Sequence, residues 1–184
     1  MFNKWTLFLT IVTMGGVDIT THPGQNQKED APVFELQSRD ELLLAVDYSQ
    51  PLKEADTIGH FSWWDDLYII VDHFSHQQYG KATVIARLIR FDHLVSTDQV
   101  LRFMDERDLR PATLAELVAF GTQYHAKQMR SSPIIALGSI WIDSSGFYHV
   151  PFIQRGYSRC CLLGFHWFHA SGQRNHRFLA VRDN

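Results

Sequence analysis

The amino-acid sequence predicts an α+β fold, with short strands toward both ends of the chain and two helices between them. Strand-like segments, rich in β-branched and aromatic residues, occur before residue 93 and again after Pro133. Between them lie two helix-capping motifs, each followed by apolar residues at helical spacing. Strands and helices grouped in this way favour an α+β architecture. At 184 residues, the chain is long enough to bury a sizeable core.

The segments before the helices have the composition of strands. Phe34–Gln37, Leu42–Asp47 and Leu67–Asp72 are short, apolar and partly β-branched. In Lys81–Phe91 the apolar residues at even positions alternate with Lys81, Thr83 and Arg87 at odd positions, which predicts a half-buried strand. A helix over the same residues is the alternative. We expect residues 34–92 to form a β-rich N-terminal segment.

Two capping boxes mark the starts of the two helices. Ser96 is followed three residues later by Gln99, and Thr113 is followed by Glu116 at the same spacing. In such a box the hydroxyl accepts a hydrogen bond from the N3 amide while the N3 side chain reaches back to the cap. Gly121 is expected to end the second helix, since glycine is common just beyond a helix C-terminus.

Beyond Pro133 the pattern predicts only strands. Ile134–Trp141 reads as one long apolar strand, Ser144–Gly146 as a turn, and Phe147–Ile153 as the second strand of a hairpin. The period of two in the next strand predicts one core face and one outward row. The core face is Cys161, Leu163, Phe165 and Trp167, and the outward row is Cys160, Leu162, Gly164 and His166. A last buried strand is expected near Phe178–Val181.

Charge and cysteine content exclude several classes of function. The net charge of −3 provides no general attraction to nucleic acid, so no nucleic-acid partner is expected. Cys160 and Cys161 are the only cysteines, which excludes a disulfide framework and a four-cysteine metal site. The adjacent residues of a strand point to opposite faces, so we expect one buried and one exposed cysteine.

Residues 1–33 are expected to be a leader followed by a polar linker. The apolar run Trp5–Val17 is too short to span a bilayer, so no transmembrane segment is predicted. One lysine precedes this run and no A-x-A cleavage site follows it, which favours a cytoplasmic location over export through an N-terminal signal. Thr20–Pro32 is polar and contains Pro, Gly and Gln, as linkers do.

Several motifs resemble a known family. Leu109–Gly121, Pro133–Trp141, Val150–Ile153 and the terminal Arg177–Arg182 together resemble a group of short proteins from small-genome bacteria. The latter half also resembles the C-type lectin-like fold of variable proteins from diversity-generating retroelements. The resemblance covers Val46 to Arg182. It implies that residues 93–184 form a C-type lectin-like domain with two helices and a small antiparallel sheet.

The resemblance also implies a diversified ligand-binding surface. In that system mutagenic reverse transcription randomises template adenines, so that Asn-type codons become Tyr, Phe, His, Ser, Cys, Arg, Gly or Leu, but not Lys, Glu or Met. Residues 142–176 contain no Lys, Glu, Met or Thr. Gln154 and Gln173 do not fit the rule, and Gly172 stands where the family usually has Trp. The residues expected to form the variable surface are Phe147, Tyr148, His149, Phe152, Tyr157, Ser158, Cys160, Leu162, Gly164, His166, His169, Arg174, Asn175 and His176.

These residue types suit binding rather than catalysis. Tyr and Phe offer large contact area at low entropic cost, so the sequence predicts a non-enzymatic protein that binds a protein or another macromolecule without a cofactor. A constant structural or interaction domain is one alternative. A metal-dependent enzyme is a weaker one, in which His149, His166, His169, His176 and Cys160 would be ligands. Their spacing matches no metal motif, and no carboxylate is expected beside them.

Overall fold

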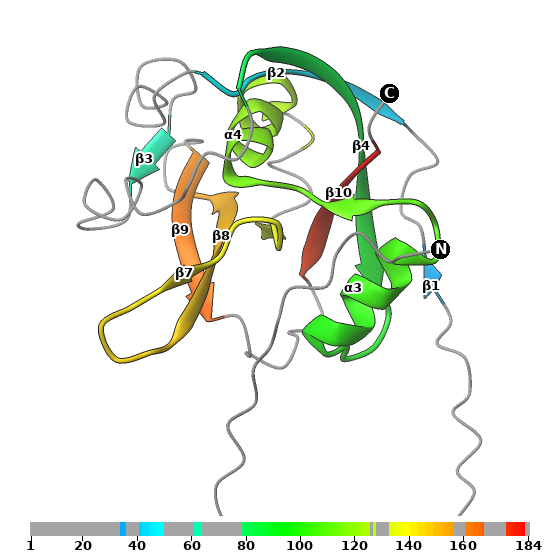
Figure 1. The fold of residues 1–184 in the computed structure, drawn as a ribbon, viewed down its shortest axis with the longest axis vertical. Helices are drawn as coiled ribbons and strands as arrows, with labels where there is room; N and C mark the ends of the chain where they lie inside the picture. The colour runs from blue at the N-terminus through cyan, green and yellow to red at the C-terminus, as the bar shows by residue number, and fades with distance from the viewer. Residues whose placement is uncertain are drawn as a thin grey trace, which may run out of the picture. The chain divides into compact units, whose positions relative to one another are not determined.

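A computed structural model of the protein describes residues 34–35, 41–49, 61–63, 79–125, 127, 133–156, 161–167 and 176–182. Pro32–Asn184 forms one compact unit. Within the described residues this unit combines two helices with a curled, mixed sheet (Figure 1). The predicted α+β class is therefore confirmed, whereas the expected strand Leu67–Asp72 lies outside the described residues.

The sheet joins strands from both ends of the described chain. Its order is β1-β4-β10-β6-β8-β9-β3, with β2 also paired to β4, β5 to β10 and β7 to β8. The β10–β6 and β3–β9 pairs are parallel and the others antiparallel. The strands are β1 (Phe34–Glu35), β2 (Leu42–Asp47), β3 (Phe61–Trp63), β4 (Lys81–Phe91), β5 (Arg110–Pro111), β6 (Ile134–Ile135), β7 (Trp141–Ile142), β8 (Tyr148–Arg155), β9 (Cys161–Trp167) and β10 (Arg177–Arg182).

The expectation of a small antiparallel sheet confined to residues 93–184 is wrong. The last strand, β10, lies between β4 and β6 and pairs with β4 along its whole length. Strands of the expected segments 34–92 and 93–184 thus belong to one sheet. The physical reason is burial, because β4 and β10 both carry apolar residues on two faces, and pairing places each face in a core.

Both predicted capping boxes are present. Helix α3 (Thr97–Asp105) begins after Ser96 and helix α4 (Leu114–Gln123) begins after Thr113, each with the two reciprocal hydrogen bonds of the motif. The predicted end of α4 at Gly121 is wrong, because the helix continues to Gln123 and is capped by Tyr124. Gly121 is buried inside the helix, and no described glycine other than Gly80 and Gly146 has a positive φ.

The segment expected to be one long strand, Ile134–Trp141, is divided into β6 and β7. Between them the chain turns aside to meet the start of α4. Gly138 donates its amide hydrogen to the carbonyl of Ala112 at 2.8 Å, and the Ser139 hydroxyl accepts from the Leu114 amide at 2.9 Å. An unpaired amide at a helix N-terminus needs such an acceptor, so capping of α4 competes with continuation of the strand.

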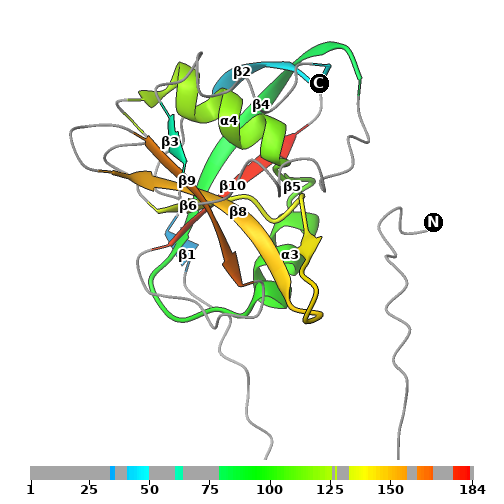
Figure 2. The ribbon, with the colours of Figure 1, turned by 90° about the vertical axis from the view of Figure 1, so that its left-hand side faces the viewer.

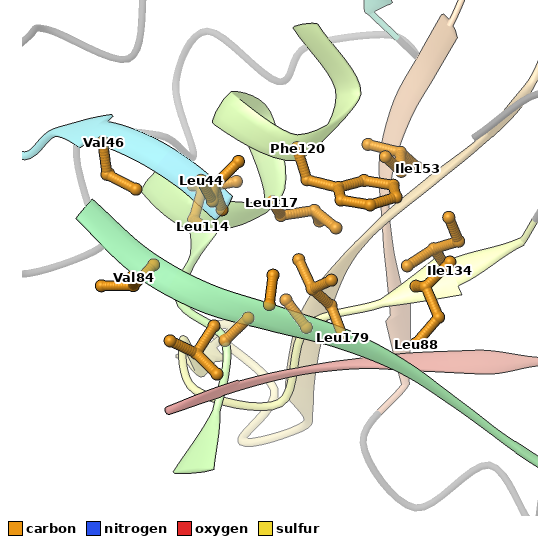
Figure 3. Packing of buried hydrophobic residues seen from close by; sticks show 14 of the residues in the cluster. Leu44, Val46, Val84, Leu88, Leu114, Leu117, Phe120, Ile134, Ile153 and Leu179 are labelled. Atoms are coloured by element: carbon orange, nitrogen blue, oxygen red, sulfur yellow. The ribbon is translucent and has the colours of Figure 1, made fainter. Parts of the chain in front are cut away.

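The two helices cover opposite faces of the β4–β10 part of the sheet (Figure 2). Along β4 the buried residues alternate, with Val84, Ala86 and Leu88 packed in the core that contains α4. Ile89 and Phe91 belong to the core that contains α3. Figure 3 shows the first of these cores, where Leu117 and Phe120 of α4 lie over the strands.

One carboxylate is buried completely within this frame. Glu116 of α4 is 0% exposed and accepts hydrogen bonds from Arg110 at 2.6 and 2.9 Å and from the Tyr48 hydroxyl at 2.5 Å. Burial by itself would raise the pKa of Glu116, but the guanidinium of Arg110, with Tyr48 and the amide of Thr113, holds this pKa below its ordinary value. Burial, reinforced by Glu116, raises the pKa of Tyr48 well above its ordinary range. The cluster ties β2, β5 and α4 together.

Candidate binding surface

The exposed apolar side chains gather on the hairpin formed by β7 and β8. Four of the seven large hydrophobic residues that are exposed among the described residues lie here: Ile140 (38% exposed), Ile142 (53%), Phe147 (54%) and Tyr148 (37%). We call these four residues the hairpin patch: Ile142 and Tyr148 are register partners on one side of the hairpin, and Ile140 and Phe147 immediately precede its two strands. Exposed apolar residues that occur singly are ordinary, whereas a group of them marks a contact surface. The hairpin protrudes from the sheet in Figure 1.

Strand alternation explains why one side of this hairpin is exposed and the other is packed. Ile142 and Tyr148 are register partners, and so are Trp141 and His149. Partners in an antiparallel pair share a face, and successive residues change face. The Ile142 and Tyr148 pair is exposed. On the other side the Trp141 ring lies 4.8 Å from the His149 ring and 6.3 Å from that of Phe165 on β9.

Asp143 holds the turn of the hairpin in one shape. Its carboxylate accepts hydrogen bonds from the amide of Ser145 at 2.8 Å, from the amide of Phe147 at 2.9 Å and from Nε2 of His149 at 2.8 Å. The hydrogen bond to His149, followed by the amide of Phe147, holds the pKa of Asp143 below its ordinary value. Gly146 completes the turn with a φ of 83°, a conformation that favours glycine.

The residues predicted to form the variable surface are only partly exposed together. Phe147 and Tyr148 belong to the hairpin patch, as expected. His149 lies beneath it and is half-buried against Trp141. Phe152 and Leu162 are half-buried on β8 and β9. The other candidates Tyr157, Ser158, Cys160, His169, Arg174 and Asn175, and the side chain of His166, lie outside the described residues.

Two of the candidates are buried, so the expectation that they face outward is wrong. Gly164 is covered by its register partner Phe152, whose ring atom Cζ would lie 2.7 Å from a Cβ placed on Gly164. His176, immediately before β10, is only 8% exposed. The alternation of side chains therefore identifies the two faces of β9. It does not show that the ring of Phe152, on the neighbouring strand β8, covers the outer face at Gly164. The core positions Cys161 and Leu163 are buried as predicted.

Three residues of the hairpin, Ile140, Ile142 and Asp143, are not among the residues predicted from the sequence to form the site. Ile140 belongs to the expected long apolar strand Ile134–Trp141 and Ile142 follows that strand with no role assigned, yet both are exposed. The available signal was their spacing around Trp141, which is that of a strand with only one buried side. The expectation that no carboxylate lies beside the histidines is also wrong, because Asp143 binds His149.

The described residues contain no group of three or more His, Cys, Asp and Glu side chains arranged to hold a metal ion. Neither α3 nor α4, the helices of the described part of the chain, is long and apolar enough to cross a membrane.

Comparison with known proteins returned no match for this chain among protein-family models, curated proteins or solved structures.

Proposed function

We propose that the protein is a non-enzymatic binding protein and that the hairpin patch contacts an apolar surface on a protein partner. The observation that carries the proposal is the clustering of Ile140, Ile142, Phe147 and Tyr148 on one hairpin. Exposed apolar area is unfavourable in water, and burying it against a partner provides the main driving force for association. Aromatic side chains at the centre of an interface contribute most of the binding energy.

The construction of the hairpin supports the same proposal. A contact surface binds more tightly when its conformation is already ordered, because less entropy is lost on association. The Asp143 carboxylate orders the turn through three hydrogen bonds, and Trp141 anchors the base of the hairpin on His149 and Phe165. The residues of the hairpin patch therefore lie on a hairpin whose turn and base are both held in place by other contacts.

The finer proposal is a C-type lectin-like scaffold with a surface diversified by a retroelement. Its support is that Phe147 and Tyr148, whose residue types fit adenine mutagenesis, are exposed, while the framework residues Ile153, Leu163 and Leu179 are buried. Sequencing the neighbouring DNA tests it. A nearby reverse transcriptase gene and a near-copy of the coding end that differs at adenines are expected. If the coding end is identical in many isolates, the surface is not diversified, and the protein is a constant binding domain instead.

Photo-crosslinking tests the binding function. The photoreactive residue p-benzoylphenylalanine is placed at position 147, and as a matched control at the exposed position Leu43 on β2. We expect position 147 alone to capture a defined protein, whose purified form then binds the wild-type chain. The triple variant Ile142→Ser, Phe147→Ser, Tyr148→Ser should lose this binding while keeping its melting temperature. Equal binding by wild type and triple variant would exclude the hairpin patch as the contact surface.

A further inference from the structure

Strand β7 has an edge to which no other described strand is paired. Among the described strands it pairs with β8 alone. The amide of Asp143, which follows β7, donates to the carbonyl of Phe147, which precedes β8, at 2.9 Å. The backbone groups of successive residues in an antiparallel strand alternate between its two edges, so those of Ile142 point away from β8. Ile142 is 53% exposed, and its N–H and C=O therefore lie at an open edge.

This edge lacks the features that normally prevent strand addition. Unpaired N–H and C=O groups are a template for another strand, and most proteins block such edges with lysine, with proline or with covering side chains. Ile140–Ile142 contains no lysine, no proline and no charged residue. The edge of β2 differs, because the side-chain amide of Gln123 bonds both backbone groups of Ala45 there. The fold thus covers one edge and leaves the other open.

A second copy of the chain has the chemistry that this edge requires. Two edges formed by Ile140, Trp141 and Ile142 carry no charge and can meet without repulsion. Asp143, the next residue, already accepts three hydrogen bonds within its own hairpin. Ile140 lies two residues before Ile142, the spacing at which the same backbone direction recurs in an extended chain. Antiparallel pairing about a two-fold axis at Trp141 then places Ile142 of each copy opposite Ile140 of the other.

We propose that two copies of the protein pair through their β7 edges and form a dimer with a continuous ribbon of four strands. Each Ile142 donates its N–H to, and accepts from, the backbone of Ile140 of the second copy. Opposed residues of antiparallel strands share a face, so the exposed Ile142 and Tyr148 of both copies lie on one side of the ribbon. The two hairpin patches thereby become one larger apolar surface. The dimer does not depend on the proposed function, because it is held by backbone groups.

The association state of the full chain tests the proposal. Sedimentation is expected to show a monomer that is converted to a dimer as the concentration rises. Hydrogen exchange at the Ile142 amide should slow over the same concentration range, because pairing gives this N–H an acceptor. The Asp143 amide, which already bonds Phe147, is the internal control, and its exchange should be independent of concentration.

Two substitutions at one position separate the backbone from the side chain. Ile142→Pro removes the outward N–H without removing a hydrogen bond to β8, and proline is tolerated on an edge strand in this way. It should raise the dissociation constant of the dimer by about tenfold or more, because two hydrogen bonds are lost per dimer. Ile142→Ala keeps the N–H and removes more apolar area than proline does. It should therefore weaken the dimer less than Ile142→Pro.

Three results would overturn the proposal. The first is a wild-type chain that stays monomeric up to about 1 mM, a concentration at which even a weak dimer is populated. The second is a dimer that Ile142→Ala weakens as much as Ile142→Pro, because the side chain would then hold it. The third is a dimer in which exchange at the Ile142 amide is unchanged, which would place the contact elsewhere. This last measurement uses the wild type and decides the question even if Ile142→Pro does not fold.

Discussion

The side-chain amide of Gln123, at the end of α4, hydrogen-bonds both backbone groups of Ala45 on β2. Its oxygen accepts from the Ala45 amide at 3.1 Å, and its nitrogen donates to the Ala45 carbonyl at 2.7 Å. The neighbouring Tyr124 donates its hydroxyl to the carbonyl of Leu43 at 2.7 Å. Among the described strands β2 pairs with β4 alone, so these side chains cover the edge at which a further strand would add.

Removing this cover is expected to expose the edge of β2. Gln123→Ala should cost about 1 kcal/mol of stability, the usual net contribution of such hydrogen bonds, and should promote self-association as the concentration rises. Urea unfolding and light scattering measure the two effects. Thr122→Ala is the control, because the Thr122 hydroxyl bonds only the Val118 carbonyl of its own helix among the contacts shown. A Gln123→Ala protein that associates no more than the wild type at any concentration would show that the edge is protected in another way.

The buried carboxylate of Glu116 makes stability sensitive to the removal of a single partner. Glu116→Leu leaves the Arg110 guanidinium, only 10% exposed, without its carboxylate, and should cost about 3–5 kcal/mol. The double variant Arg110→Met, Glu116→Leu should lose less, because no unpaired charge is left inside. Chemical denaturation compares the two. A double variant less stable than the single one would mean that the ion pair contributes more than its burial costs.

Glu116 also predicts a loss of stability in acid. Its pKa in the folded protein lies below its ordinary value of 4.5, so between these two values the unfolded chain binds more protons than the folded one. The stabilisation that Glu116 gives the folded protein is complete at a pH above the ordinary pKa of 4.5. It disappears as the pH falls through the pKa of Glu116 in the folded protein. Melting temperatures measured across this range should fall more steeply for the wild type than for Glu116→Leu. Equal slopes for the wild type and Glu116→Leu would contradict this role of Glu116.

Gly138 is expected to tolerate no side chain. A Cβ at this position would lie 2.6 Å from the carbonyl oxygens of both Ala112 and Pro111, and backbone atoms cannot turn away as a side chain can. Gly138→Ala should therefore cost about 2 kcal/mol or more, measured by thermal unfolding. Gly146→Ala is the comparison, since it meets no atom within 4 Å but has a φ of 83° and should cost about 1 kcal/mol. A smaller loss at Gly138 than at Gly146 would contradict the close approach.

The size of the side chain tolerated at position 164 is expected to depend on the size of the side chain at position 152. A Cβ on Gly164 would meet the far end of the Phe152 ring, which can move, so Gly164→Ala should cost less than Gly138→Ala. In a Phe152→Leu background the same change should cost little, and a double-mutant cycle measures the coupling. Additive effects would show that the ring does not rest on the glycine. If these positions are diversified, large residues at one should accompany small residues at the other.

Asp143 is expected to control the order of the hairpin. Asp143→Ala removes the acceptor of the Ser145 and Phe147 amides and of His149 Nε2. Hydrogen exchange should then accelerate at these amides but not in β10, which is buried in the sheet. Ser144→Ala, in the same turn, is the control. Because its pKa is lowered, the Asp143 carboxylate should keep the turn ordered to a pH below the ordinary aspartate range. Unchanged exchange in Asp143→Ala would assign the order of the turn to the backbone alone.

Much of the local structure could be predicted, because it depends on residues close together in the chain. The capping boxes of Ser96 and Thr113 need only a partner three residues away, and both helices begin where these motifs stand. Alternation along Lys81–Phe91 is also local, and the strand forms over that range. The turn at Ser144–Gly146 follows from its composition in the same way.

The candidate site could be predicted only in part. Phe147 and Tyr148 were found from residue type, but the exposure of Ile140 and Ile142 depends on which side of the hairpin faces the rest of the sheet. The burial of Gly164 depends on a ring that belongs to another strand. Neither feature can be derived from the residues of one segment.

The sequence by itself determined the α+β class, the starts of both helices and the alternating faces of the strands, since neighbouring residues decide these through sterics and local hydrogen bonds. The tertiary structure alone decided the order and register of the sheet. That register places Arg90 opposite Arg177, Gly164 under Phe152 and the Ile142 and Tyr148 pair on the exposed side of the hairpin. Such contacts join residues far apart in the chain, and they depend on how all the strands together bury their apolar faces.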